Sequence, residues 1–124
     1  MQAEVTVLRS PATHTLAELA QIAAEPLRRA GAERAIAFGS YARGTADGYS
    51  DLDLVVVLRT HLPLTERWPL LRELLDALPV SVDLLVYTPE ELALGMEQRT
   101  GIFDVIDREG VLLYAATQAV EPPR

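Results

Sequence analysis

The apolar residues of this chain gather into short segments of two kinds, continuous runs and helix-spaced series. Largely continuous runs are typical of buried β-strands, and they predict four strands at Arg34–Phe38, Asp51–Arg59, Pro79–Tyr87 and Val111–Tyr114. Residues 54–58 carry no polar side chain at all. The second strand is therefore expected to be buried on both faces, at the centre of a sheet.

Helix-spaced apolar residues lie between the predicted strands. Thr15 and Glu18 form a capping-box pattern that starts a helix, which is expected to break or kink near residues 24–25 because of Pro26. Gly31 is a plausible end for the same segment. Further helices are predicted at 40–46, 65–78, 88–99 and 102–108, and Trp68 is expected to lie in the core.

Strands that alternate with helices predict the fold class. The expectation is a small α/β domain with a mixed sheet of about four to five strands, flanked by helices. We expect a single domain over residues 1–116, with a weak strand or loose arm at 4–8 and a disordered tail at 117–124. A chain of 124 residues is long enough to bury a core in one such domain.

The residue types present restrict the chemistry. The chain has no cysteine, which excludes disulfides, thiol nucleophiles and Cys-ligated zinc. All 11 basic residues are arginine, so neither a P-loop lysine nor a Schiff-base lysine is possible. The two histidines fit no metal-binding motif. Carboxylates, hydroxyls and arginines, together with any metal they bind, remain for chemistry.

Charge and hydropathy restrict the location and the partners. The net charge of −7 makes nucleic acid an unlikely direct partner, since that affinity depends on basic residues at phosphates. No apolar run approaches 18 residues, so no membrane association is expected. The N-terminal residues lack the basic and apolar regions of a signal peptide, which favours a cytoplasmic protein.

A Gly-Ser pair and an Asp-x-Asp pair flank the first loop between strands. Glycine at 39 lets the backbone approach a ligand closely, and Ser40 offers an N–H and a hydroxyl. Asp51 and Asp53 lie about 6.5 Å apart on one strand face, at a rise of roughly 3.3 Å per residue. Because two carboxylates on one face repel each other, a divalent cation such as Mg²⁺ is expected between them.

Asp83 is the third candidate acid, in a strand that is otherwise apolar. If that strand neighbours the second one, three carboxylates converge and describe a metal-dependent nucleotidyl transfer site with two Mg²⁺ ions. Asp51 and Asp53 would hold both ions, and Asp83 would ligate the ion nearer the acceptor and could take its proton. Gly39 and Ser40 would hold the terminal phosphates, so that pyrophosphate leaves.

Each of these features also has a purely structural explanation. An isolated Asp-x-Asp at a strand start is usually a solvated turn, and Asp83 could form an ion pair with an arginine. Arg43 either contacts phosphate or braces its loop through Asp47. Tyr41 and Tyr49 are expected in solvated loop positions rather than against a nucleotide.

These motifs resemble those of the minimal nucleotidyltransferases, small members of the DNA polymerase β-like superfamily. The residues that carry the resemblance are Phe38–Gly44, Ser50–Leu54, Val82–Leu84 and the ending Glu109–Tyr114. The resemblance spans roughly residues 15–115. It implies an enzyme that binds ATP and Mg²⁺, with catalytic and metal-binding roles for Asp51, Asp53 and Asp83, and phosphate-binding roles for Gly39, Ser40 and Arg43.

The resemblance also implies a partner protein. Such chains commonly accompany a HEPN-domain RNase toxin, and the nucleotidyltransferase acts as the antitoxin by transferring AMP onto a toxin tyrosine. Two alternatives stay open: a non-catalytic antitoxin that neutralises its partner by contact, and a small-molecule nucleotidyltransferase acting on an aminoglycoside-like acceptor. Because no separate acceptor domain is evident, the partner protein or a homodimer could supply that surface.

Overall fold

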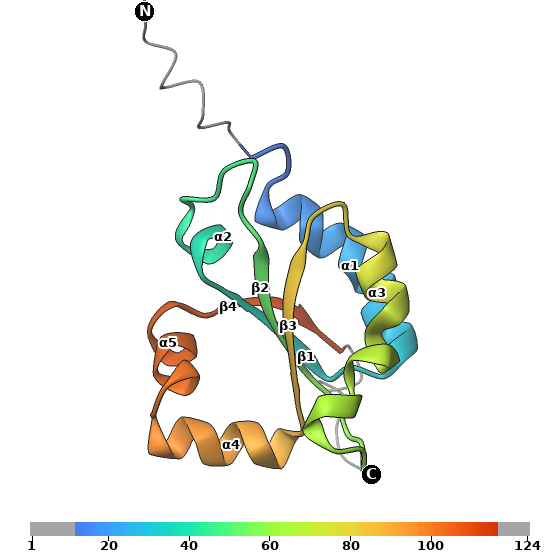
Figure 1. Cartoon of the computed structure of the whole chain (residues 1–124), viewed down its shortest axis with the longest axis vertical. Helices are drawn as coiled ribbons and strands as arrows, with labels where there is room; N and C mark the ends of the chain where they lie inside the picture. The colour runs from blue at the N-terminus through green and yellow to red at the C-terminus, as the bar shows by residue number, and fades with distance from the viewer. Residues whose placement is uncertain (1–11, 117–124) are drawn as a thin grey trace, which may run out of the picture.

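The fold is a mixed four-stranded sheet between two layers of helices (Figure 1). The computed structural model describes residues 12–116, and the predicted arm at 4–8 and tail at 117–124 lie outside the described residues. The strands are β1 (Arg34–Phe38), β2 (Leu52–Val57), β3 (Val82–Tyr87) and β4 (Val111–Ala115). The helices are α1 (Leu16–Ala30), α2 (Ser40–Arg43), α3 (Arg72–Ala77), α4 (Pro89–Gln98) and α5 (Ile102–Glu109).

The strand order is β3-β2-β1-β4. β1 runs antiparallel to β2 and to β4, whereas β2 and β3 are parallel. This arrangement confirms the predicted α/β class and the mixed sheet. No helix within residues 12–116 is long and apolar enough to cross a membrane.

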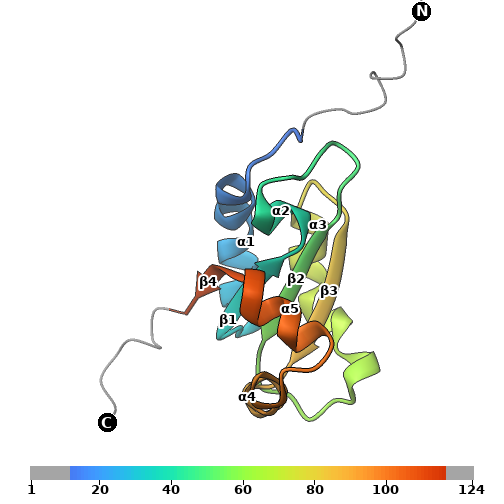
Figure 2. The ribbon, with the colours of Figure 1, turned by 90° about the vertical axis from the view of Figure 1, so that its left-hand side faces the viewer.

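β2 lies at the centre of the core, as its uninterrupted apolar run predicts. Leu54 and Val56 face the layer that contains α1 and α3, whereas Val55 and Val57 pack with residues of α4 and α5. All four side chains are fully buried. The two helical layers lie on opposite sides of the sheet when the molecule is turned by 90° (Figure 2). Asp53, which alternates with Leu54 along the strand, therefore shares the α4–α5 face.

The starts of α1 and α4 and the end of α1 follow their sequence signals. Both predicted capping boxes form: Thr15 with Glu18 starts α1, and Thr88 with Glu91 starts α4. Gly31 ends α1 with φ 81°. Of the predicted break or kink near residues 24–25, the break is wrong, because α1 continues through Pro26 to Ala30. Pro26 and Leu27 are both buried, and this burial offsets the backbone hydrogen bond that proline cannot make.

The predicted helix at 65–78 is only partly formed. Two 3₁₀ turns occupy Leu64–Glu66 and Trp68–Leu71, and the α-helix itself begins at Arg72. Pro69 explains the late start, because it lacks an N–H and disfavours α-helical backbone at the residue before it. Trp68 is 50% exposed rather than in the core, and the Arg72 guanidinium lies 5.1 Å from the centre of its ring.

A buried arginine connects this irregular segment to α4. Arg67 is 5% exposed, and its guanidinium donates to the backbone carbonyls of Leu62 and Val86. The same group pairs with both carboxylate oxygens of Glu91, at 2.6 and 3.0 Å. The Arg67 hydrogen bonds lower the pKa of Glu91 to about 2, while burial opposes that shift. These hydrogen bonds replace the bonds to water that the buried Arg67 guanidinium has lost.

Replacing Glu91 by Gln should weaken the acid dependence of stability. Since the pKa of Glu91 lies below its usual value of 4.5 in the folded protein, the carboxylate stabilises the fold above pH 4.5, and this contribution is lost as the pH falls toward 2. Urea unfolding between pH 7 and pH 2.5 should show a shallower loss for Glu91→Gln than for wild type. Glu97→Gln, an exposed position on the same helix, should keep the wild-type slope.

Candidate functional site

A glycine turn at the end of β1 lies directly against an acidic residue of β2. Phe38 is the register partner of Asp53 across the antiparallel pair, so the next residue, Gly39, lies beside the Asp53 side chain. A Cβ on Gly39 would lie 2.1 Å from Asp53 Oδ2. Gly39 also has φ 76° and ψ −154°, a conformation that other residues rarely adopt. Both observations require glycine at this position.

The parallel pairing of β2 with β3 places two of the predicted acids side by side. Asp53 and Asp83 are direct register partners, so the two carboxylates leave the same end of the sheet on the same face. Asp51 immediately precedes β2, two residues before Asp53, rather than lying within the strand as predicted. Asp51 and Asp83 are exposed, whereas Asp53 is partly buried.

The electrostatics of Asp53 reflect this crowding. Burial raises the pKa of Asp53, and the negative charges of Asp83 and then Asp51 raise it further, while the charge of Arg43 opposes the shift. Asp83 forms no ion pair with any residue from 12 to 116, so the alternative of a structural arginine partner is not observed in this range.

The acids form an open group rather than a closed ligand cage. Over residues 12–116, no three Asp, Glu or His side chains are gathered closely enough to hold a metal ion. The oxygen donors nevertheless match the preference of Mg²⁺, which binds one or two carboxylates and completes its coordination with water and phosphate oxygens. A cation held in that way needs fewer than three protein side chains at contact distance.

The structure adds a residue to the site that the sequence reasoning did not select. Glu109, the last residue of α5, accepts hydrogen bonds from the Gly39 N–H and from the Arg43 guanidinium, each at 2.9 Å. Arg43 thus pairs with Glu109. A signal was present in the sequence, because an acidic residue at a helix C-terminus is electrostatically unfavourable unless a partner compensates it.

The predicted short helix after Gly39 is a single turn. α2 covers Ser40–Arg43 and ends at Gly44 with φ 78°, so it stops before residue 46. The Ser40 hydroxyl has no hydrogen-bond partner among residues 12–116, while its backbone carbonyl accepts from the Thr45 N–H at 2.9 Å. Ser40 is therefore available for a ligand at the end of β1.

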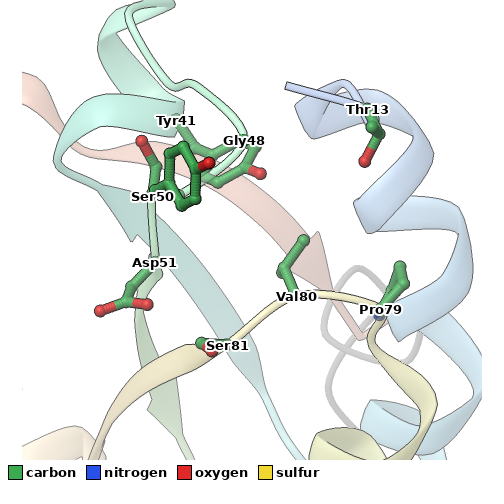
Figure 3. Close-up of a pocket in the computed structure, with 9 residues that line it drawn as sticks. Thr13, Tyr41, Gly48, Ser50, Asp51, Pro79, Val80 and Ser81 are labelled. Carbon is green, nitrogen blue, oxygen red and sulfur yellow. The ribbon is translucent and has the colours of Figure 1, made fainter. Parts of the chain in front are cut away.

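A pocket of about 350 Å³ adjoins the acids (Figure 3). It lies between the loop before β2 and the segment that enters β3, and its lining includes Asp51, Ser81, Tyr41 and Tyr49 but neither Asp53 nor Asp83. Tyr41 is buried, 7% exposed, so its prediction as a solvated loop residue is wrong. Tyr49 is 77% exposed, as expected.

Comparison with known proteins agrees with this geometry. Residues 17–107 match the nucleotidyltransferase domain family, and the chain therefore belongs to this family. No curated protein sequence matches the chain.

Solved structures of nucleotidyltransferases and toxin–antitoxin systems share the fold. A toxin–antitoxin structure with AMP-PNP has 26% sequence identity and a TM-score of 0.53, over 77% of this chain and 72% of that one. A chain from Sulfolobus solfataricus, proposed to be a nucleotidyltransferase, has 18% identity and a TM-score of 0.53, over 86% and 94% of the two chains. A variant of the MntA–HpeT toxin–antitoxin has 21% identity and a TM-score of 0.50, over 96% and 77%.

Gly39→Ala should destabilise the protein more than Gly44→Ala. Gly44 lies in the left-handed helical region, which costs about 1 kcal/mol when the residue has a side chain. Gly39, at ψ −154°, lies in a region that is essentially restricted to glycine, and only at Gly39 does a Cβ meet Asp53. We expect the free energy of unfolding of Gly39→Ala to fall by about 1–3 kcal/mol more than that of Gly44→Ala, as in overpacked sites. Equal losses in urea unfolding would show that the Asp53 contact is unimportant.

Asp53→Asn should stabilise the metal-free protein at neutral pH. Because the pKa of Asp53 is raised in the folded state, its ionised form costs stability as the pH rises through that pKa. In urea unfolding with a chelator, the advantage of Asp53→Asn over wild type should be larger at pH 7 than at pH 3.5. Asp76→Asn, at an exposed position on α3, should show no such pH-dependent advantage.

Proposed function

We propose that this chain transfers a nucleoside monophosphate, most simply AMP from ATP, to a hydroxyl of a partner protein, and that the partner is a HEPN-type toxin with a tyrosine as acceptor. The chain would then be the antitoxin of the pair. Membership of the nucleotidyltransferase domain family supports the reaction class. The toxin–antitoxin structure with AMP-PNP supports both the adenine nucleotide and the type of partner.

One structural observation carries the proposal. The register of β2 against β3 brings Asp53 and Asp83 together, and Gly39 packs against Asp53 from the other side. Carboxylates that lie side by side repel each other. Burial, and then the charges of Asp83 and Asp51, raise the pKa of Asp53. A purely structural site gains nothing from this repulsion. In a site that binds a cation, the cation relieves the repulsion and its remaining charge attracts the triphosphate.

Divalent metal suits these donors, and nucleotidyltransferases generally use one with a nucleoside triphosphate. Asp51 and Asp53 would hold Mg²⁺, with Asp83 as a further ligand, and two ions fit the reaction class. When bound, the metal supplies positive charge that offsets the charge developing on the attacking and leaving oxygens.

The protein groups have separate tasks in this proposal. The free hydroxyl and the backbone N–H of Ser40, which follows the Gly39 turn, bind the terminal phosphates, since the Gly39 N–H is already donated to Glu109. The half-exposed Arg43 guanidinium adds positive charge beside them. Asp83, on the exposed edge strand β3, can accept the proton of the attacking hydroxyl. The α-phosphorus then gains a bond to the acceptor oxygen and loses its bond to pyrophosphate.

Transfer to a labelled partner tests the proposal. Purified protein, Mg²⁺ and each of the four α-labelled ribonucleoside triphosphates are incubated with a HEPN-type toxin encoded beside this chain. We expect label on the toxin from one nucleotide, and at least about 100-fold less with the Asp51→Asn/Asp53→Asn variant, which lacks two charged ligands. Asp76→Asn serves as the control that keeps both ligands and should label normally.

Two outcomes would contradict the enzymatic proposal. If the double variant neutralises the toxin as well as wild type does, the chain acts by contact and its acids are not catalytic. If label appears on an aminoglycoside-like small molecule and never on the toxin, the reaction class holds but the acceptor is wrong.

A further inference from the structure

Glu109 connects the C-terminal end of α5 to the Gly39 turn, 70 positions earlier in the chain. A single carboxylate oxygen, Oε1, accepts both the Gly39 N–H and the Arg43 guanidinium, each at 2.9 Å. The Glu109 side chain is 20% exposed, so water competes only weakly for these bonds. The contact therefore fixes a backbone group and a side chain of the site together.

The Gly39 turn is held on three sides. The Asp53 side chain fills the space where a Cβ would lie, the Arg43 N–H donates to the Gly39 carbonyl at 3.0 Å, and Glu109 accepts the Gly39 N–H. Glycine at this φ has no side chain of its own to restrict the turn. The orientation of the peptide between Phe38 and Gly39 consequently depends on Glu109.

Arg43 also depends on this carboxylate. Its guanidinium is 51% exposed, and Glu109 is its ion-pair partner among residues 12–116. The positive charge of Arg43 lowers the pKa of Asp53 against the larger effect of burial, while Glu109 raises it, so both partners of this ion pair act on the acids electrostatically. Without Glu109, the Arg43 guanidinium is free to turn toward the acids and to form an ion pair with Asp53, which should remain available for a ligand.

We infer that Glu109 is a positioning residue for nucleoside triphosphate binding: it orients the Gly39 turn and holds the Arg43 guanidinium beside the phosphate site and away from Asp53. This role rests on the proposed function, because it concerns the same site. It is separate from the metal-binding acids, and it assigns a task to α5, which supplies none of the predicted site residues.

The test compares Glu109→Ala with Glu109→Gln, which keeps an oxygen acceptor for both donors. Asp107→Ala, two residues away on the same helix and ion-paired with Arg99, is the matched control. Hydrogen exchange of the Gly39 amide, followed by NMR without metal, reports the turn directly. Binding of AMP-PNP and of AMP, each with Mg²⁺, reports the phosphate site.

For Glu109→Ala we expect at least tenfold faster exchange of the Gly39 amide and about tenfold weaker AMP-PNP binding, the loss typical of a charge-assisted hydrogen bond. Its affinity for AMP should stay within about twofold of wild type, since AMP lacks the terminal phosphates. Glu109→Gln should recover most of the AMP-PNP affinity, and Asp107→Ala should match wild type. A general loss of structure would instead weaken both ligands.

Each of the other outcomes overturns either the role of Glu109 or the proposed function. Unchanged AMP-PNP binding by Glu109→Ala removes the role of Glu109 alone, and tighter binding shows that Glu109 competes with phosphate instead of positioning the turn. Failure of wild type to bind any nucleoside triphosphate removes the proposed function, whatever the exchange result. If Glu109→Ala does not fold, Glu109→Asp gives the same comparison, because its shorter side chain no longer reaches the Gly39 N–H.

Discussion

The alignment of two like charges in neighbouring strands is the constraint on which this structure depends. β2 must supply fully buried apolar residues to both helical layers and, at its N-terminal end, a carboxylate on one face. The alternation of side chains along the strand satisfies both demands, since Asp53 is only partly buried while Val55 and Val57, on the same face, lie in the core. The repulsion between Asp53 and Asp83 is maintained by the hydrogen-bonded register of the whole β2–β3 pair.

An ion pair at the opposite end of the sheet stabilises the fold that holds these carboxylates together. There the buried Arg67 pairs with the half-exposed Glu91, and the pair joins the irregular segment before α3 to the first turn of α4. Breaking a buried ion pair by removing one partner is far more costly than losing a surface pair. The two ends of the sheet therefore differ: carboxylates lie side by side at one end, without a cationic partner for Asp83 among residues 12–116, and the buried Arg67 is paired with Glu91 at the other.

Much of the fold could be predicted from local patterns. The four strands, both capping boxes and the central position of β2 follow from apolar runs and from residue types that act within four positions. Predictions failed where tertiary contacts or proline chemistry decided the outcome: α1 continues through Pro26 because its ring is buried, and Trp68 lies outside because Pro69 delays the helix to Arg72.

The candidate site shows the same division. Asp51, Asp53 and Asp83 could be selected because their spacing and strand positions indicate a common face, and Gly39 because close approach needs glycine. Glu109 could not be selected with equal ease, since its place at a helix C-terminus indicates that a partner is needed but not that the partner lies 70 positions away. Tyr41 was misplaced for a related reason, because its burial depends on contacts with the α1 side of the core.

The hydrogen bond between Glu109 and Gly39 also determines when, during synthesis of the chain, the Gly39 turn can be completed. On a ribosome, β1 and α2 are synthesised first, and the 70 residues up to Glu109 follow at roughly 5–20 residues per second, which takes on the order of several seconds. Once Asp83 has been added, and until Glu109 follows, the acids and the Gly-Ser pair are all present, but the turn lacks its carboxylate and β1 lacks its β4 edge partner. Nascent or truncated chains that end between Asp83 and Glu109 thus carry all three acids without the Glu109 contact on which the proposed phosphate site depends.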